Sequence, residues 1–165
     1  MNQNVYVGIG ANLPSIHGLP PLQTARDAVV ALDRLPGFRL VGLSRWFVSA
    51  PIPPSDQPDY INAVAHLRGE SDPVEFLHIL QRIELTSGRE RGAVNAARTL
   101  DLDIVAMDGL VRNAPDPVLP HPRAHLRAFV LLPLADVAPH WVHPVLGRSV
   151  RELIAALPDQ PIRVL

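Results

Sequence analysis

The sequence contains no cysteine, and this absence excludes disulfide bonds and thiolate chemistry. The two signs of charge almost balance, because 15 basic and 16 acidic residues give a formal net charge of -1. Nucleic acid and anionic membranes are therefore not indicated as partners. No run approaches the roughly 20 apolar residues of a membrane span, and no basic region with a long apolar stretch opens the chain. We expect a cytoplasmic protein that binds neither membranes nor nucleic acid.

Apolar residues and proline are abundant by comparison. The chain has 165 residues, of which 47% are hydrophobic, so residues 1–165 can bury the core of a single domain. Eighteen prolines accompany only two tyrosines and two tryptophans, which indicates many rigid loops. Binding sites are often built on such loops.

Hydrophobic periodicity predicts four strands and two helices in the first two thirds of the chain. The predicted strands are Val5–Ile9, Phe38–Phe47, Tyr60–Leu67 and Leu100–Met107, and the predicted helices are Leu22–Leu35 and a second one capped by Asp72 and ended at Gly88. This βαββαβ order predicts an α+β fold of the ferredoxin-like type, with a mainly antiparallel sheet.

The last third predicts additions to this core. Asp108-Gly109 is a hairpin turn signal that leads to an added strand at Leu110–Arg112. Short C-terminal helices are expected around residues 124–131 and 134–138, and a last helix opens with a capping box formed by Ser149 and Glu152.

Two acids stand out in the fourth predicted strand. Asp101 and Asp103 are two residues apart in an apolar run, so they point to the same face while Leu100, Leu102 and Ile104 point to the core. Two like charges side by side cost stability unless a cation lies between them. A hard cation such as Mg²⁺, held by carboxylates and substrate phosphates, suits the pair. A solvated edge strand with two incidental acids is the alternative.

Basic residues precede and follow this pair. Arg89, Arg91 and Arg98 lie just before it, and guanidinium groups bind phosphate oxygens in pairs of hydrogen bonds. Arginines next to two acids indicate phosphoryl transfer, although a solvated basic loop has the same composition. His121 lies between two prolines, which suits either a structural turn or a rigid phosphate donor.

An aromatic residue and an amide share one face of the third predicted strand. Tyr60 and Asn62 are two residues apart, and Phe129 lies further along the chain. A flat heterocycle is bound by aromatic stacking and by hydrogen bonds at its edge, so these residues are candidates for such a site, although both types are also common in protein cores.

Taken together, the motifs resemble the 6-hydroxymethyl-7,8-dihydropterin pyrophosphokinase family of folate biosynthesis, almost from end to end. The resemblance rests on the segments Gly10–Leu13, Asp56–Ala63, Gln81–Glu84, Gly88–Arg91, Arg98–Asp103, Leu119–Pro122 and Arg127–Leu134.

The resemblance implies transfer of pyrophosphate from ATP to the hydroxymethyl group of the pterin, with release of AMP. It implies two Mg²⁺ ions held by Asp101 and Asp103, with Arg89 and Arg98 as further catalytic residues. ATP would contact Gln81, Glu84, Arg91, His121 and Arg127, and the pterin would contact Ser49, Ala50, Ile52, Tyr60, Asn62 and Phe129. We expect a monomer whose partners are these two small molecules.

Other functions fit less well. A non-catalytic pterin or nucleotide-binding relative would not need both aspartates. An RNA-binding module on a ferredoxin-like sheet would need aromatic stacking pairs and a basic surface. A sugar transferase that binds a nucleotide sugar through a metal would need a larger nucleotide-binding domain.

Overall fold

The computed structural model describes residues 3–15, 17–87 and 99–165 of the chain. In chain order the elements are β1 (Gln3–Ala11), α1 (Pro21–Asp33), β2 (Phe38–Leu43), β3 (Phe47–Ser49), β4 (Tyr60–Gly69), α2 (Pro73–Thr86), β5 (Asp101–Met107), the short 3-10 helix η1 (Ala124–Leu126), α3 (Ala128–Val137), α4 (Val150–Ala155) and β6 (Ile162–Val164).

One antiparallel sheet forms the centre of the molecule. The strands follow the order β5-β1-β4-β3-β6, and β2 pairs with β4 beside β3. The order β5-β1-β4-β2 is that of a ferredoxin-like core, so the predicted fold class is confirmed.

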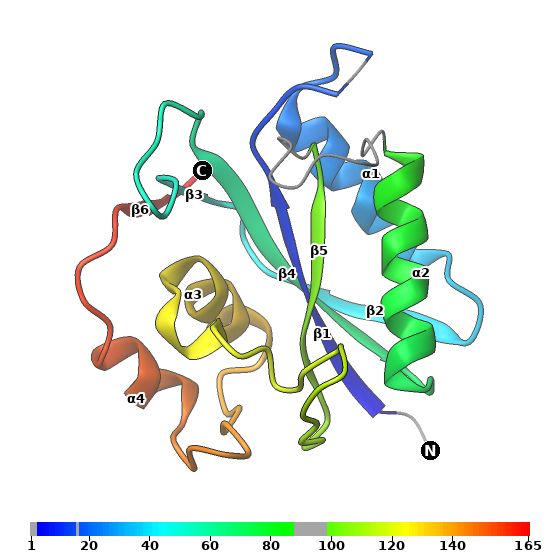
Figure 1. Cartoon of the computed structure of the whole chain (residues 1–165), viewed down its shortest axis with the longest axis vertical. Coiled ribbons are helices and arrows are strands. Elements are labelled where there is room, and N and C mark those ends of the chain that lie inside the picture. Colours follow the sequence, from blue (N-terminus) through cyan, green and yellow to red (C-terminus); the bar gives the residue numbers. More distant parts are fainter. Residues whose placement is uncertain (1–2, 16, 88–98) are drawn as a thin grey trace.

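Helices cover both faces of this sheet, as Figure 1 shows. Side chains from the sheet, such as Val5, Val7 and Ile9 of β1, form one buried cluster together with apolar residues of α1 and α2. The alternate face of β1 contributes Tyr6 to a second cluster, which includes Leu131 and Leu134 of α3 and Leu153 of α4. Because strand side chains alternate between faces, one strand supplies both cores.

Local capping defines two helix starts that the sequence predicts. The Asp72 carboxylate accepts hydrogen bonds from the backbone N–H groups of Val74 and Glu75, and Pro73 follows at the first helical position of α2. Ser149 and Glu152 form both bonds of the capping box at the start of α4.

The predicted strand Phe38–Phe47 is interrupted and forms two strands, β2 and β3. At the break, the backbone N–H of Val64 donates to the Ser44 hydroxyl, and the Arg45 backbone and guanidinium donate to Asp136 of α3. These bonds replace ladder hydrogen bonds, and β3 then pairs with a different part of β4.

The prediction of an added hairpin strand at Leu110–Arg112 is wrong. The turn itself forms, with φ of 22° at Asp108 and 74° at Gly109, but beyond it Arg112 makes only an isolated bridge to Leu119. Prolines at 115, 117 and 120 have no N–H to extend a ladder. The added strand is β6, at the other end of the sheet.

The two helices expected around residues 124–131 and 134–138 are arranged differently. After η1, one continuous helix, α3, runs through Pro133 to Val137. Proline removes one helical hydrogen bond, and burial of Leu131 and Leu134, both fully inaccessible to solvent, offsets this loss.

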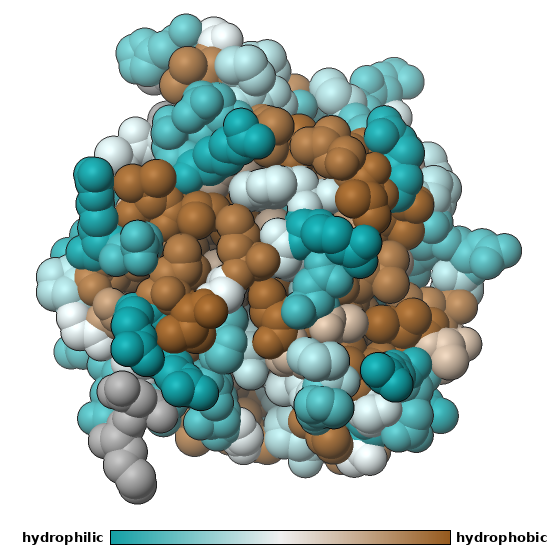
Figure 2. All heavy atoms as spheres, turned by 180° about the vertical axis from the view of Figure 1, so that it is seen from behind, coloured by the Kyte–Doolittle hydropathy of each residue, from teal (hydrophilic) through white to brown (hydrophobic). Residues whose placement is uncertain are grey.

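The surface seen from behind mixes apolar and polar side chains (Figure 2).

The edge strand β2 carries two exposed apolar side chains, Val41 and Leu43. Arg39 on the same strand is also exposed, and the pairing of β2 with β4 shifts register between Leu40 and Gly42. A charge and a bulge on an edge strand hinder its pairing with another chain. None of the described helices has the length and apolar content needed to cross a membrane.

Candidate active site

A cleft opens on the sheet face that α3 partly covers. Its floor is formed by β1, β4 and β5, where Gly10 pairs with Asn62 on one side and with Asp101 on the other. Gly8 pairs in the same way with Asp103. A Cβ atom added to Gly10 would lie 3.4 Å from Asn62 Oδ1. The two glycines therefore leave the floor bare between the polar side chains of the neighbouring strands.

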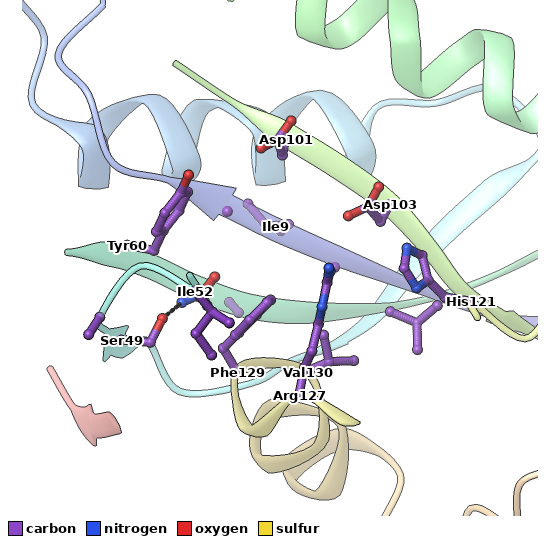
Figure 3. Close-up of a pocket in the computed structure, with 16 residues that line it drawn as sticks. Ile9, Ser49, Ile52, Tyr60, Asp101, Asp103, His121, Arg127, Phe129 and Val130 are labelled. Atoms are coloured by element: carbon purple, nitrogen blue, oxygen red, sulfur yellow. Dashed lines mark hydrogen bonds between the residues drawn. The ribbon is translucent and has the colours of Figure 1, made fainter. Parts of the chain in front are cut away.

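Ten of the residues predicted to form the site meet in this cleft, which has a volume of about 220 Å³. Figure 3 shows most of them converging from β3, β4, β5, the segment around His121 and the start of α3. They are Ser49, Ala50, Ile52, Tyr60, Asn62, Asp101, Asp103, His121, Arg127 and Phe129.

The acid pair lies as the strand alternation predicts. Asp101 and Asp103 point from β5 into the cleft (Figure 3), while Leu100, Leu102 and Ile104 are buried on the other face. Two carboxylates on one face, with no side chain opposite them on β1, are a suitable donor set for a hard divalent cation.

Glu84 supports this strand from α2. Its Oε2 accepts a hydrogen bond of 3.1 Å from the backbone N–H of Leu102, which lies between the two aspartates, and its side chain is 3% exposed. The sequence predicted that Glu84 and Gln81 line the ATP side. Neither residue lines the cleft, and Gln81 is exposed on α2.

Two basic groups face the acids from the opposite wall. Burial lowers the pKa of His121, and the nearby Asp103 carboxylate partly opposes this effect. His121 Nδ1 accepts from the Arg123 backbone N–H at 3.2 Å, so a neutral ring carries its proton on Nε2. Burial likewise lowers the pKa of Arg127, against the opposing effect of Asp103.

The other end of the cleft is aromatic and neutral. Phe129 and Tyr60 both line it, and the Arg127 guanidinium carbon lies 5.3 Å from the centre of the Phe129 ring. Asn62 Nδ2 donates to Ser49 Oγ at 2.7 Å, and both residues are buried. This bond fixes the orientation of the amide at the wall of the cleft.

Three predicted residues, Arg89, Arg91 and Arg98, lie outside the described residues.

Other residues that shape the site were not predicted from the sequence. The sequence shows Gly8 and Gly10 two residues apart in a strand, and this spacing could have indicated a bare face. Asn12 is 2% exposed and donates to Gln57 Oε1 and to the carbonyl of Pro58. It joins the loop after β1 to the proline-rich loop before β4.

Comparison with known proteins decides between the functions that such a cleft allows. The model of the 7,8-dihydro-6-hydroxymethylpterin-pyrophosphokinase (HPPK) family matches residues 6–139. The chain belongs to this family. The HPPK resemblance inferred from the motifs is confirmed, and with it the role of a pyrophosphokinase in folate biosynthesis.

Relatives of this HPPK chain match all or nearly all of its length. A 2-amino-4-hydroxy-6-hydroxymethyldihydropteridine pyrophosphokinase from Pseudomonas aeruginosa is 42% identical over 165 residues, which is 100% of this chain and 98% of that protein. The protein of the same name from Haemophilus influenzae is 36% identical and covers 93% of this chain. The folic acid synthesis protein fol1 of Pneumocystis carinii is 32% identical over 98% of this chain, which spans 21% of that protein.

Solved structures agree on the fold. A crystal structure of HPPK-DHPS in complex with substrates has a TM-score of 0.70 at 12% identity. Wild-type Plasmodium falciparum HPPK-DHPS with pteroate has a TM-score of 0.68, also at 12% identity. Each match covers 94% of this chain, which spans 43% and 42% of the two solved chains.

Proposed function

We propose that this chain transfers pyrophosphate from ATP to the hydroxymethyl group of 6-hydroxymethyl-7,8-dihydropterin and releases AMP. The observation that carries the proposal is the composition of one cleft. Asp101 and Asp103 face His121 and Arg127 at one end, and Tyr60, Asn62 and Phe129 line the other end. A polyphosphate and a flat heterocycle are the two ligands that such a cleft suits.

At the acidic end, Asp101 and Asp103 would hold Mg²⁺, and we propose two ions there. The donor set fits, since two carboxylates on one strand face leave the remaining positions to phosphate oxygens and water. When bound, the ions neutralise negative charge on the triphosphate. We propose that Arg127 and the Nε2–H of His121 bind phosphate oxygens from the other wall.

At the neutral end, the pterin would lie between Tyr60 and Phe129, and Asn62 would form hydrogen bonds with its edge. Support comes from the orientation of the Asn62 amide, which Ser49 fixes from the buried side. Ala50 and Ile52 complete this wall of the cleft.

In the reaction, the hydroxyl oxygen of the pterin attacks the β-phosphorus of ATP. A new O–P bond forms between this oxygen and the β-phosphorus, and the bond from the β-phosphorus to the oxygen bridging to the α-phosphate breaks. AMP leaves with that bridging oxygen, and the hydroxyl proton passes to water. Arg127 would stabilise charge on the transferred group, and catalysis by positioning and charge neutralisation is typical of phosphoryl transfer.

Arg89 and Arg98 remain proposed as catalytic residues, and Arg91 as an ATP ligand, on the sequence motif alone. The prediction that Gln81 and Glu84 contact ATP also stays a prediction. We further propose that the enzyme is monomeric, because residues of one chain form the cleft and the edge strand β2 is poorly suited to pairing. A single domain and a cytoplasmic location stay predictions from the sequence.

The deciding experiment measures AMP formed from ATP and the pterin alcohol by the purified chain. We expect AMP and pterin pyrophosphate in equal amounts, and no turnover after addition of a chelator until Mg²⁺ is restored. Binding of the pterin without AMP formation would instead support a non-catalytic binding protein and overturn the proposal.

A further inference from the structure

The C-terminal segment, residues 158–165, lies beside the candidate active site although none of its residues lines the cleft. Figure 1 shows its strand β6 next to β3. Ser49 pairs with Ile162, and the backbone N–H of Ala50 donates to the Pro161 carbonyl at 3.3 Å. The segment therefore contacts the wall of the cleft that carries Ser49 and Ala50.

One side chain of this segment also contacts the opposite wall. Gln160 Oε1 accepts from the backbone N–H of Ala128 at 2.9 Å, and Gln160 Nε2 donates to the Leu126 carbonyl, also at 2.9 Å. These two backbone groups lie on either side of Arg127. A single amide side chain thus holds the backbone before and after this arginine.

This contact supplies what the start of α3 lacks. Arg127 occupies the N-cap position of α3, with an extended backbone, and no side chain caps the helix locally. The first N–H groups of a helix have no partner within it. Gln160 satisfies the first of them from 32 residues away, and so it contacts the backbone directly next to Arg127.

Other contacts also hold α3 in place. Leu131 and Leu134 are fully buried between α3 and the sheet and anchor the helix. Pro161, Arg163, Val164 and Leu165 are all exposed, so the segment adds little apolar burial of its own. Loss of the Gln160 side chain should therefore alter the geometry at Arg127 more than the stability of the fold.

We propose that Gln160 is a positioning residue that aligns Arg127 for the reaction. This inference rests on the proposed function, which gives Arg127 its contact with phosphate.

The first test compares Gln160→Ala with Asp159→Ala, a matched change at the exposed neighbouring position. In steady-state assays with ATP and the pterin alcohol, we expect kcat/KM of Gln160→Ala to fall about tenfold, because a misaligned Arg127 loses part of its charge-assisted hydrogen bonding to phosphate. Asp159→Ala should match the wild type in rate and thermal midpoint, and the thermal midpoint of Gln160→Ala should fall by only a few degrees, since the apolar residues of α3 stay buried. Unchanged kcat/KM in Gln160→Ala would overturn the inference.

A double-mutant cycle with Arg127→Ala separates positioning from a general structural role. If Gln160 acts through Arg127, Gln160→Ala should have little further effect on kcat/KM in the Arg127→Ala background. Additive losses would overturn the inference. If Arg127→Ala itself kept wild-type turnover, the role of Arg127 in the proposed function would fail, whereas an inactive Arg127→Ala beside a fully active Gln160→Ala would reject the positioning role alone.

Discussion

Asp101 and Asp103 illustrate how single residues form the site. Each is paired across the ladder with a glycine of β1, so no side chain separates the carboxylates from the cleft. The opposite wall contributes the Arg127 cation and the His121 imidazole. A charge change at any of these positions should therefore affect turnover far more than folding.

For Asp103→Asn we expect kcat to fall about a thousandfold or more, because the amide keeps the volume of the side chain but loses the charge that a divalent cation needs. Asp103 is exposed, so the unfolding midpoint should stay near that of the wild type. Asp33→Asn, at the exposed end of α1, is the control. A variant at position 103 that retains most of its turnover would exclude the metal assignment.

Phe129→Ala tests the pterin end. Loss of an aromatic stacking partner should raise KM for the pterin by a factor of about 5 to 160, as the 1–3 kcal/mol of base stacking on aromatic side chains implies, while KM for ATP changes much less. Leu126→Ala, at a residue that is 56% exposed two positions before the α3 start, serves as control. Equal increases in both KM values would contradict the assignment of Phe129 to the pterin.

At the scale of elements, the edge strand β5 depends on α2. The Glu84 carboxylate gives the Leu102 N–H a partner, because no strand among the described residues lies beyond β5. This contact explains why a carboxylate is buried in a helix whose other buried residues, Phe76 and Leu80, are apolar. The hydrogen bond from Leu102 to Glu84 lies midway between Asp101 and Asp103, the two acids of the site.

Replacement of Glu84 by Ala should lower the free energy of unfolding by about 1–3 kcal/mol, since the Leu102 N–H is left without its partner, and kcat should fall because the acid pair loses its support. Glu84→Gln keeps an oxygen acceptor and should retain most of both. His78→Ala, on the exposed side of α2, is the control. Urea unfolding and initial rates measure the two effects, and a stable, fully active Glu84→Ala would refute the role.

For the whole molecule, three histidines link stability to pH. Burial lowers the pKa of His66, His121 and His143 below the usual value near 6.5. The unfolded chain therefore binds protons first as the pH falls through about 6.5. The folded state gains stability from these groups above that pH and loses it as the pH approaches their lower pKa values.

We expect the urea midpoint to fall between pH 7.5 and pH 5.5. The decrease should be smaller in His66→Gln, because the glutamine side chain cannot titrate. Its amide can still donate a hydrogen bond to Asn4 Oδ1, which lies 2.8 Å from His66 Nε2 in the wild type. We expect a second loss of stability as the pH falls below about 4. Burial raises the pKa of Asp136, but hydrogen bonds from Arg45 outweigh it and lower the value. A midpoint independent of pH from 7.5 to 5.5 would contradict the histidine linkage.

The sequence by itself determined what depends on neighbours along the chain. Strand alternation places Asp101 and Asp103 on one face, and the caps at Asp72 and Ser149 define helix starts, because these patterns follow from backbone geometry within a few residues. The motifs also identified the family.

Only the tertiary structure decided which distant segments meet. The bond between Asn12 and Gln57 spans 45 residues and that between Gln160 and Ala128 spans 32. Strand β6 finds its partner in β3, and the added strand predicted at Leu110–Arg112 does not form. Local rules carry no information on such pairings, because their free energy depends on where the whole chain brings each donor and acceptor.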